Sequence, residues 1–512
     1  MYKFNNLSKL NYLILFISGA IATFSISPFS FLPLLFCFGF GIYLINYAPT
    51  LLKTFLSAWF LALGWFSCGL YWISSAFFVA DKYHMFLMPI AMILLPSFLA
   101  LFWGSACVIA KLLSRNKTFS IIYIIVSLSL FEYFRAKLFT GFPWLMPSIV
   151  LSSNENLIQI FSFIGSFSAN LVVLATSVLP FILISNFKGK YFVFLSLLIP
   201  ILILFFCGIF RYQNKTNLKI KDQFITLVQP NIEQRNKWNL KRRDQNLKKL
   251  VELSSSNSDL FKNKNRIIIW PETSFEGSIP NEIKLLTSIS KQVIKSPKTT
   301  LIVGLLRTEK RKIFNSLVFL NFEGKILYQY DKIKLVPFGE YIPFRNYLRA
   351  ISDFLNPKDF SSGKILSNPN LEGFGNIITL ICYEILFADE INKRISKKTN
   401  LLINITNDAW FGKTIGPYQH LALAKIKAVE FGLPLARVAN TGISVYISSF
   451  GDVISEIPLY NEGVKTFNLT SKLDSTFYKI YGEYIFVVLI LILLIINKIS
   501  NFIHKETLYN EK

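Results

Sequence analysis

The sequence is poor in charged residues, histidine and cysteine. Charged side chains make up 16% of it, whereas a soluble globular protein carries about 25%. Its three histidines and five cysteines follow no zinc or haem spacing, so we expect no metal site. The cysteines also lack the paired spacing of a disulfide framework. These shortages argue against a metalloprotein and against a disulfide-stapled secreted domain.

Apolar residues are abundant instead. Hydrophobic residues account for 52% of the chain, and the mean hydropathy is +0.44. We therefore expect an integral membrane protein with a further domain attached. The net charge is +24, but the basic clusters at 241–243 and 307–312 have no nucleic-acid-binding motif around them. A basic domain beside an anionic lipid surface is the better interpretation, with the membrane and not nucleic acid as partner.

Long apolar runs divide the chain into regions. A helix needs about 20 apolar residues to cross a bilayer, and about seven such runs fill the first 210 residues. With one more near the C-terminus, they lie near 11–27, 29–48, 54–79, 85–112, 118–134, 156–185, 191–210 and 484–497. We predict a membrane domain at 1–210, an attached domain at 211–480, and a transmembrane helix with a tail at 481–512.

The basic residues of the short loops predict the orientation of these spans, because Lys and Arg are enriched on the cytoplasmic side. If the N-terminus is inside, the cytoplasmic segments hold Lys3, Lys9, Lys53, Arg115, Lys117, Lys188, Lys190, Lys498, Lys505 and Lys512. The opposite loops hold only Lys82, Arg135 and Lys137. An odd number of spans then places residues 211–480 outside the cytoplasm.

A loop at 135–155 falls on the same outer side. Its Phe142, Trp144 and Met146 are apolar and interfacial in character. Glu132 and Arg135 flank it, either as a local ion pair or as a functional pair at the membrane edge.

Residues 211–480 differ in pattern from the membrane region. Short runs rich in β-branched and aromatic residues predict strands at 224–228, 267–270, 301–303, 317–320, 377–381, 401–405 and 444–447. Helix-like stretches separate several of them, for example at 418–431. This alternation over about 270 residues indicates one large α/β domain.

Three short motifs lie at or just after predicted strands. Glu272 follows Trp270-Pro271, Lys332 follows Tyr330-Asp331, and Cys382 precedes Tyr383-Glu384. Together they hold a base, a cation and a thiol, the minimum set for acyl transfer through a thioester. The other four cysteines lie inside apolar stretches, so Cys382 is the candidate nucleophile.

Each motif has a simpler interpretation when taken alone. Glu272 could be a solvated or helix-capping carboxylate, Lys332 a surface charge, and Cys382 a buried structural thiol. The coincidence of all three with these flanking residues favours the functional interpretation.

The three motifs, in this order, resemble those of the nitrilase superfamily. With its membrane region the chain is similar to the apolipoprotein N-acyltransferase family, and further matching stretches are 140–144, 229–231, 335–340, 407–412, 416–420 and 437–442. The resemblance implies a helical membrane domain joined to a nitrilase-like αββα sandwich. It also implies a bacterial inner-membrane protein whose catalytic domain lies on the periplasmic side.

Residue roles follow from the resemblance position by position. It implies that Glu272 is the general base, Lys332 the oxyanion-stabilising cation and Cys382 the nucleophile. The positions that match supporting or substrate-binding residues are Trp238, Glu340, Tyr383 and Glu384. Two alternatives stay open, since Glu340 could only hold Lys332 in place and Trp238 could be a buried aromatic anchor. For His420 we expect a structural hydrogen bond.

The activity implied is a ping-pong acyl transfer in lipoprotein maturation. Cys382 would take an acyl chain from a phospholipid, phosphatidylethanolamine by the resemblance, and pass it to the α-amine of diacylglyceryl-cysteine on an apolipoprotein. No metal or dissociable cofactor is required. One rival is a membrane-tethered amidase acting on a small soluble amide, which would have no need of seven spans. Another is a transporter, which would carry more ionisable residues within its spans than Glu132.

Overall fold

The computed structural model describes residues 9–79, 82–114, 121–186, 189–256, 258–261, 263–347, 358–364 and 367–509. Lys3, Arg115, Lys117, Lys188 and Lys512, which entered the orientation argument, lie outside these ranges. The chain forms two compact units. One comprises 1–74, 86–215 and 476–512, and the other comprises 75–85 and 216–475.

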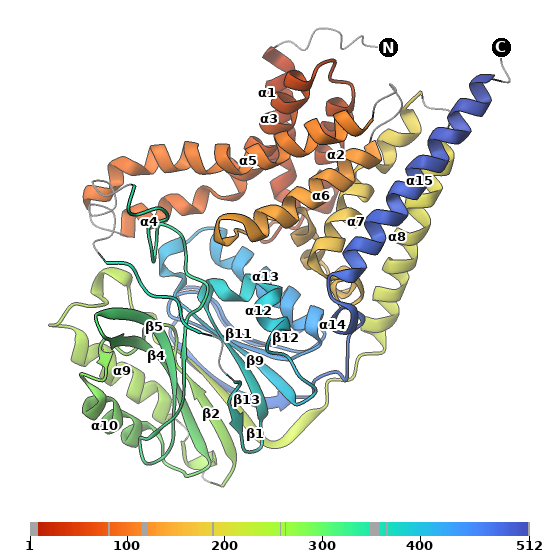
Figure 1. Ribbon diagram of the computed structural model, residues 1–512. Helices are drawn as coiled ribbons and strands as arrows, with labels where there is room; N and C mark the ends of the chain where they lie inside the picture. Colours follow the sequence, from red (N-terminus) through yellow and green to blue (C-terminus); the bar gives the residue numbers. More distant parts are fainter. Residues whose placement is uncertain are drawn as a thin grey trace. The chain divides into compact units, whose positions relative to one another are not determined.

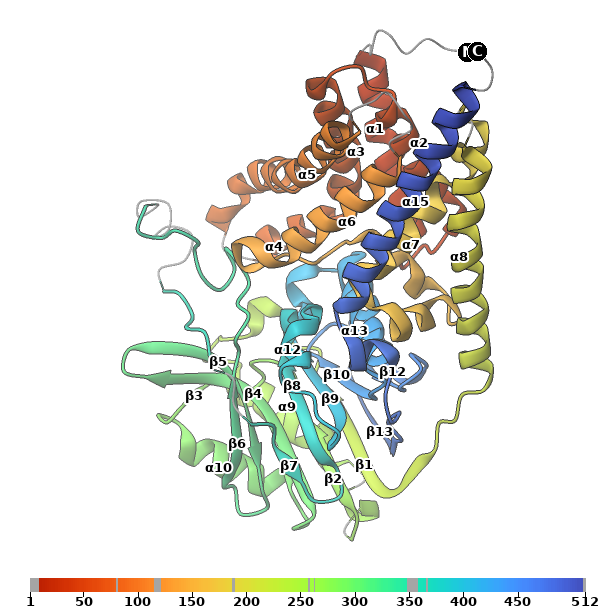
Figure 2. The same ribbon diagram turned by 45° about the vertical axis from the view of Figure 1, so that its right-hand side comes forward.

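The first unit is helical (Figures 1 and 2). Its helices are α1 Lys9–Ala22, α2 Leu35–Asn46, α3 Leu51–Gly69, α5 Met88–Leu113, α6 Ile121–Lys137, α7 Ile160–Ile184, α8 Lys190–Gln213, α14 Phe477–Tyr481 and α15 Tyr484–Tyr509. Among the described residues, five helices are long and apolar enough to cross a membrane: Leu51–Gly69, Met85–Leu113, Leu157–Ile184, Lys190–Gln213 and Tyr484–Ile503. The apolar helices Lys9–Ser25 and Leu32–Asn46 are shorter. The number of membrane crossings stays a prediction.

Close helix packing in this unit depends on glycine. A Cβ on Gly19 of α1 would lie 2.0 Å from the carbonyl oxygen of Leu61, and one on Gly64 of α3 would lie 1.9 Å from that of Phe16. Small residues of this kind let two apolar helices approach each other closely in a lipid environment. The lack of a side chain at Gly19 and Gly64 therefore allows α1 and α3 to pack this closely.

A buried ion pair lies in the same unit. Arg135 donates to Glu132 Oε1 at 3.0 Å through Nε, and Trp103 donates to the same oxygen at 2.7 Å. Arg135 also donates to the main-chain oxygen of Trp144 at 2.9 Å. Trp144 and Met146 are buried within the unit, so describing them as interfacial was wrong. They pack inside because the charged pair ties the main chain of this loop to α6.

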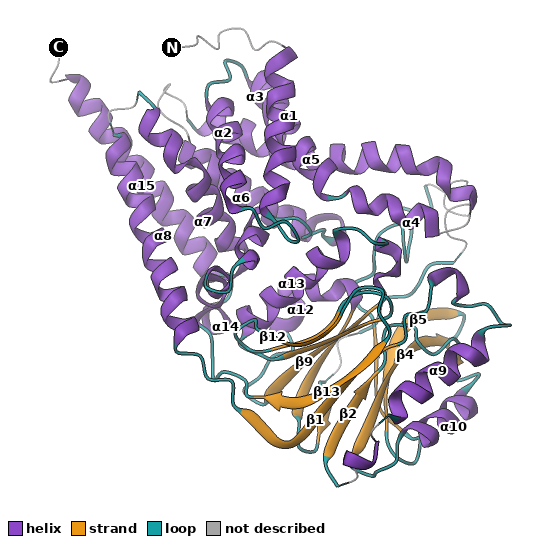
Figure 3. Cartoon of the chain, turned by 180° about the vertical axis from the view of Figure 1, so that it is seen from behind, coloured by secondary structure: helices purple, strands orange, loops and turns teal. Residues whose placement is uncertain are grey.

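The second unit contains two β-sheets, coloured by secondary structure in Figure 3. Its first sheet has the order β13-β1-β2-β4-β5-β6, with β3 also paired to β4. These strands are β1 Lys219–Gln229, β2 Asn265–Ile269, β3 Ser278–Ile279, β4 Thr299–Glu309, β5 Lys312–Leu320, β6 Ile326–Asp331 and β13 Gly463–Thr470.

The second sheet has the order β12-β11-β10-β9-β8-β7. Its strands are β7 Asn370–Leu371, β8 Gly375–Ile381, β9 Thr399–Thr406, β10 Leu435–Ala439, β11 Ser444–Ile447 and β12 Val453–Ile457. The remaining helices of this unit are α4 Ser74–Val79, which begins at its boundary, α9 Arg243–Ser255, α10 Ile283–Val293, α12 Ala388–Asn392 and α13 Gly416–Phe431.

The two sheets pack face to face around an apolar core. Alternate residues of both sheets meet there, such as Ile267 and Ile302 of the first and Ile381 and Ile403 of the second. A second apolar cluster packs α9 and α10 against the outer face of the first sheet, and α12 and α13 cover the second sheet (Figures 1 and 3). The expected αββα sandwich is confirmed.

Strand direction brings the predicted site residues to one edge of the first sheet. β2 is parallel to β4, β4 is antiparallel to β5, and β5 is antiparallel to β6. The C-terminal ends of β2 and β6 therefore point the same way, although β4 and β5 separate them. Glu272 and Lys332 each follow one of these ends.

Candidate active site

Glu272 lies in a tight turn after β2. A Cβ on Gly304 of the neighbouring β4 would lie 2.4 Å from the Pro271 oxygen and 2.7 Å from the Glu272 Cα, so only glycine fits there. The Glu272 side chain is buried. Asn315 of β5 donates to its Oε1 at 2.7 Å. The orientation of the Glu272 carboxylate is thus fixed by a side chain of β5 and not by solvent.

Lys332 lies between two carboxylates. Its ammonium donates to Glu340 Oε1 at 2.9 Å and lies 3.5 Å from Glu272 Oε1. Asn315 donates to Glu340 as well, at 3.0 Å, and the Val336 amide donates to the other Glu340 oxygen at 2.8 Å. Burial lowers the pKa of Lys332, but the charges of Glu340, Glu272 and Cys382 outweigh it and raise the pKa above its usual value. The lysine is therefore a permanent cation.

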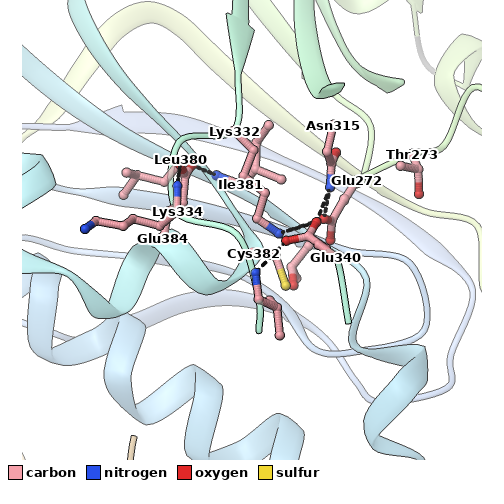
Figure 4. A network of polar contacts seen from close by, with 12 residues as sticks. Glu272, Thr273, Asn315, Lys332, Lys334, Glu340, Leu380, Ile381, Cys382 and Glu384 are labelled. Carbon is pink, nitrogen blue, oxygen red and sulfur yellow. Dashed lines mark hydrogen bonds and ion pairs between the residues drawn. The ribbon is translucent and has the colours of Figure 1, made fainter. Parts of the chain in front are cut away.

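Cys382 comes directly after β8 and begins a short 3-10 helix, Cys382–Leu386. Its φ is +52°, in the left-handed region that a non-glycine residue adopts at a cost. The residue is half-buried, and Figure 4 shows its sulfur pointing toward the group formed by Glu272, Glu340 and Lys332. Such a turn presents a nucleophile at the edge of a sheet.

The Cys382 thiol is protonated at neutral pH. Burial raises its pKa, the charge of Glu272 raises it further, and the charge of Lys332 lowers it. The net shift is upward. A nucleophilic thiol of this kind needs a base at the moment of attack, because only the thiolate is nucleophilic.

Glu384 ties the end of β8 to the end of β6. Its Oε2 accepts a hydrogen bond from the Ile381 amide at 2.7 Å, and its Oε1 accepts from the Ile333 amide at 2.6 Å. The Tyr330 hydroxyl donates to Oε1 at 2.9 Å. Ile381 precedes Cys382 and Ile333 follows Lys332, so one buried carboxylate sets the spacing between the candidate nucleophile and the candidate cation (Figure 4).

Trp238 and Tyr383 have different environments. The Trp238 side chain is 44% exposed, so the alternative of a buried aromatic anchor is wrong. Its main-chain amide donates to Glu276 Oε2 at 3.3 Å. Tyr383 is buried and its ring centroid lies 5.1 Å from that of Phe387. An exposed indole is free to meet a substrate, whereas Tyr383 is held by packing.

Two residues of the site were missed by reasoning from the sequence. Asn315 joins Glu272 to Glu340, and the only signal for it is a polar residue within the apolar strand β5. Lys237 donates to the Glu272 main-chain oxygen at 3.1 Å and to Thr273 Oγ1 at 2.7 Å. Burial lowers the pKa of Lys237 to about 8, while the charges of Glu272 and Glu276 oppose this shift.

His420 belongs to a buried polar network. Its Nδ1 lies 3.0 Å from Asp408 Oδ1, and Arg437 donates to Asp408 Oδ2 at 2.7 Å. Burial and the charge of Arg437 lower the pKa of His420. Burial raises the pKa of Asp408, but Arg437 and His420 reverse the shift and hold it below its usual range. His420 Nδ1 also lies 2.9 Å from Arg437 Nη2, so the hydrogen bonding expected for His420 is present within this group.

Comparison with known proteins covers both units. Residues 224–476 match the carbon-nitrogen hydrolase family, and residues 18–179 match the apolipoprotein N-acyltransferase N-terminal domain. The apolipoprotein N-acyltransferase of Rhodopseudomonas palustris is 32% identical over 94% of this chain and 94% of its own. That of Brucella suis biovar 1 is 30% identical over 90% of each chain.

A solved structure, a CN-hydrolase superfamily protein from Xanthomonas campestris, covers 50% of this chain and 91% of its own, with 16% identity and a TM-score of 0.35. The assignment does not depend on that structure. Relatives at this level of identity, matched along nearly their whole length, establish that the chain belongs to the apolipoprotein N-acyltransferase family.

Proposed function

We propose that this chain transfers an acyl chain from a phospholipid to the N-terminal α-amine of diacylglyceryl-cysteine on apolipoproteins, in lipoprotein maturation. The names of the curated relatives support this activity. The observation that carries the mechanism is the contact of the buried Lys332 ammonium with Glu272 and Glu340, beside a partly exposed Cys382. Base, cation and thiol are then the catalytic Glu-Lys-Cys triad.

In the first half-reaction the Glu272 carboxylate removes the Cys382 thiol proton as Sγ attacks the ester carbonyl carbon of the phospholipid. A C–S bond forms, and Lys332 stabilises the negative charge on the carbonyl oxygen. When this intermediate collapses, the C–O ester bond breaks. Glu272 returns the proton to the glycerol oxygen, and a lysophospholipid leaves with the acyl chain held as a thioester on Cys382.

In the second half-reaction the free α-amine of the lipoprotein attacks the thioester carbonyl. Glu272 accepts a proton from the amine, Lys332 again stabilises the oxyanion, and the C–S bond breaks. The proton passes to Sγ, which restores the thiol and leaves an amide on the lipoprotein. Because side chains supply nucleophile, base and cation, the reaction requires no metal or dissociable cofactor.

The supporting residues take separate parts in this proposal. Glu340 holds the Lys332 ammonium, and Glu384 sets the distance between the strand ends that carry Lys332 and Cys382. Tyr383 braces the turn after Cys382 by packing on Phe387. Trp238, with its exposed indole, is the candidate for contact with an acyl chain or lipid.

The apolar helices suit substrates of this kind. Both the donor and the acceptor carry acyl chains, and removing a chain from a bilayer costs about 0.8 kcal/mol per CH₂. We place the protein in the bacterial inner membrane, with residues 211–480 as the catalytic domain on the periplasmic side. A soluble-amide hydrolase would have no use for the helices of the first unit.

The test is a two-substrate assay with the purified full-length protein. Phosphatidylethanolamine with a labelled acyl chain and a synthetic diacylated lipopeptide should yield labelled triacylated lipopeptide and lysophospholipid, and Cys382→Ser should yield neither. Phosphatidylglycerol with the same acyl chains serves as the head-group comparison. Hydrolysis of a small soluble amide without acyl transfer would overturn the proposal in favour of the amidase.

A further inference from the structure

A row of polar side chains crosses the second sheet behind Cys382. Leu380 of β8 pairs with Asn404 of β9, which pairs with Arg437 of β10. Ile403 and Ile405 belong to the core between the sheets, as do Ala436 and Val438. Side chains alternate along a strand, so Asn404 and Arg437 point to the opposite face of the sheet.

Both side chains of this row are fully buried. Burying an amide or a guanidinium costs free energy unless each polar atom finds a partner. Arg437 donates to Asn404 Oδ1 at 2.5 Å through Nη1 and to Asp408 Oδ2 at 2.7 Å through Nη2. The Asn404 amide nitrogen donates to the Leu380 oxygen at 3.3 Å and to the Cys382 oxygen at 3.2 Å. The row therefore ends on the main chain of the nucleophile.

The Cys382 carbonyl lies beyond the last paired residues of β8 and β9. Pairing between β8 and β9 ends with Ile381 and Ile405, and the next residue turns into the left-handed region with φ +52°. A strained main chain of this kind persists only where its surroundings hold it. Asn404 supplies such a hold through its hydrogen bond to the Cys382 carbonyl oxygen.

We propose that Asn404 is a positioning residue for the nucleophile, oriented by Arg437 and Asp408, and that it holds the Cys382 main chain in the conformation that aims Sγ at Glu272 and Lys332. Asn404 does not touch the reacting atoms. It acts through the Cys382 carbonyl, so its loss should displace the thiol without changing the binding of lipid. Of the two measurements that test this inference, the rate of thioester formation rests on the proposed function, whereas the alkylation of Cys382 does not.

A matched control lies on the same strand. Asn400 of β9 also donates from its side chain to a main-chain oxygen, that of Phe374, at 3.0 Å. It is four residues before Asn404 on the same strand, at the register shift where the pairing of β9 with β8 begins. Asn400→Ala removes the same kind of bond from a place outside the site. This variant measures how much stability and how much rate are lost when a side-chain bond of this kind is removed elsewhere on β9.

The experiment compares Asn404→Ala, Asn404→Thr and Asn400→Ala in the full-length protein. In single-turnover assays with phospholipid, Asn404→Ala should slow thioester formation on the order of 10- to 100-fold with little change in KM, as for a displaced reacting group. Asn404→Thr keeps a hydroxyl donor and should regain part of the rate. Asn400→Ala should stay close to the wild type.

The second readout needs no acyl substrate. The pH dependence of Cys382 alkylation by iodoacetamide, followed by mass spectrometry, should shift in Asn404→Ala and superimpose on the wild type in Asn400→Ala. If wild-type Cys382 forms no thioester while alkylation still shifts, the proposed function fails and the positioning role stands. Equal rates and equal alkylation profiles in the two alanine variants, or a loss that follows only the folded fraction, would overturn the role of Asn404.

Discussion

The carboxylate of Glu340 is hydrogen-bonded to the ammonium of Lys332 at 2.9 Å, closer than the 3.5 Å that separates this ammonium from Glu272. Glu340 is also held by the Val336 amide and by Asn315. The nearer and better-held carboxylate is the main counterion of the lysine. This arrangement leaves Glu272 less tightly paired, which suits the general-base role that we propose for it.

Glu340→Gln should therefore weaken Glu272 as a base. Without the Glu340 charge, Lys332 would pair with Glu272 alone, and a tightly paired carboxylate is a poorer proton acceptor. We expect thioester formation to slow on the order of 10- to 100-fold, measured by single-turnover mass spectrometry. Glu309→Gln, which changes an exposed carboxylate of β4, is the control. An unchanged rate would leave Glu340 without a part in the first step.

Cys382 should form an acyl thioester with phospholipid alone, because the first half-reaction needs no amine. Mass spectrometry of the lipid-treated protein should find the added mass on the peptide containing Cys382, and Cys382→Ser should lose it. The other four cysteines, Cys37, Cys68, Cys107 and Cys207, are internal controls. Acylation at any of them in place of Cys382 would contradict the assignment.

High pH should rescue Glu272→Gln more than Lys332→Met. Burial and Glu272 raise the pKa of Cys382, whereas Lys332 lowers it. Removing the Glu272 charge therefore lowers the thiol pKa while it removes the base, a loss of about 10²- to 10⁴-fold at neutral pH that hydroxide can replace. Removing Lys332 raises the thiol pKa further and also weakens the oxyanion site. The measurement is the rate of thioester formation against pH, and equal rescue of both variants would show that the two roles are wrongly assigned.

Glu384→Gln should destabilise the second unit. Its carboxylate accepts from Tyr330, Ile333 and Ile381, and an amide group in its place turns a donor toward at least one of these donors. A buried donor left unpaired costs about 1–3 kcal/mol, measured as a lower thermal midpoint in detergent. Tyr330→Phe is the milder comparison, since it removes one bond and leaves the main-chain amides of Ile333, Lys334 and Ile381 paired with the carboxylate. Equal midpoints for Glu384→Gln and wild type would show that the carboxylate is not holding the strand ends.

The orientation of the chain is open to labelling in spheroplasts. Lys310 is exposed between β4 and β5, and Lys498 is exposed on α15. In a background without the native cysteines, a thiol reagent that cannot cross membranes should modify Lys310→Cys in intact cells and Lys498→Cys only after lysis. The basic residues of the loops predict this order. The reverse pattern would place residues 211–480 in the cytoplasm.

Several features of the protein follow from local sequence alone. Apolar runs long enough for a bilayer predict the helical unit. Strand-like runs predict an α/β domain, and the motifs at Glu272, Lys332 and Cys382 predict its candidate triad. These features can be predicted from short stretches of sequence, because the periodicity of a helix or strand and the position of a strand end depend on neighbouring residues. The αββα sandwich was predicted by resemblance to a family.

Other features depend on residues far apart in the chain. Asn315 reaches Glu272 across 43 positions and Ile333 reaches Glu384 across 51, so these partners depend on strand register and on the packing of two sheets. The exposure of Trp238 and the burial of Trp144 were likewise decided by packing. The sequence by itself determined the candidate triad and the strand ends at which its residues lie. Only the tertiary structure decided which buried groups hold them, because a hydrogen bond forms between whatever atoms the fold brings together.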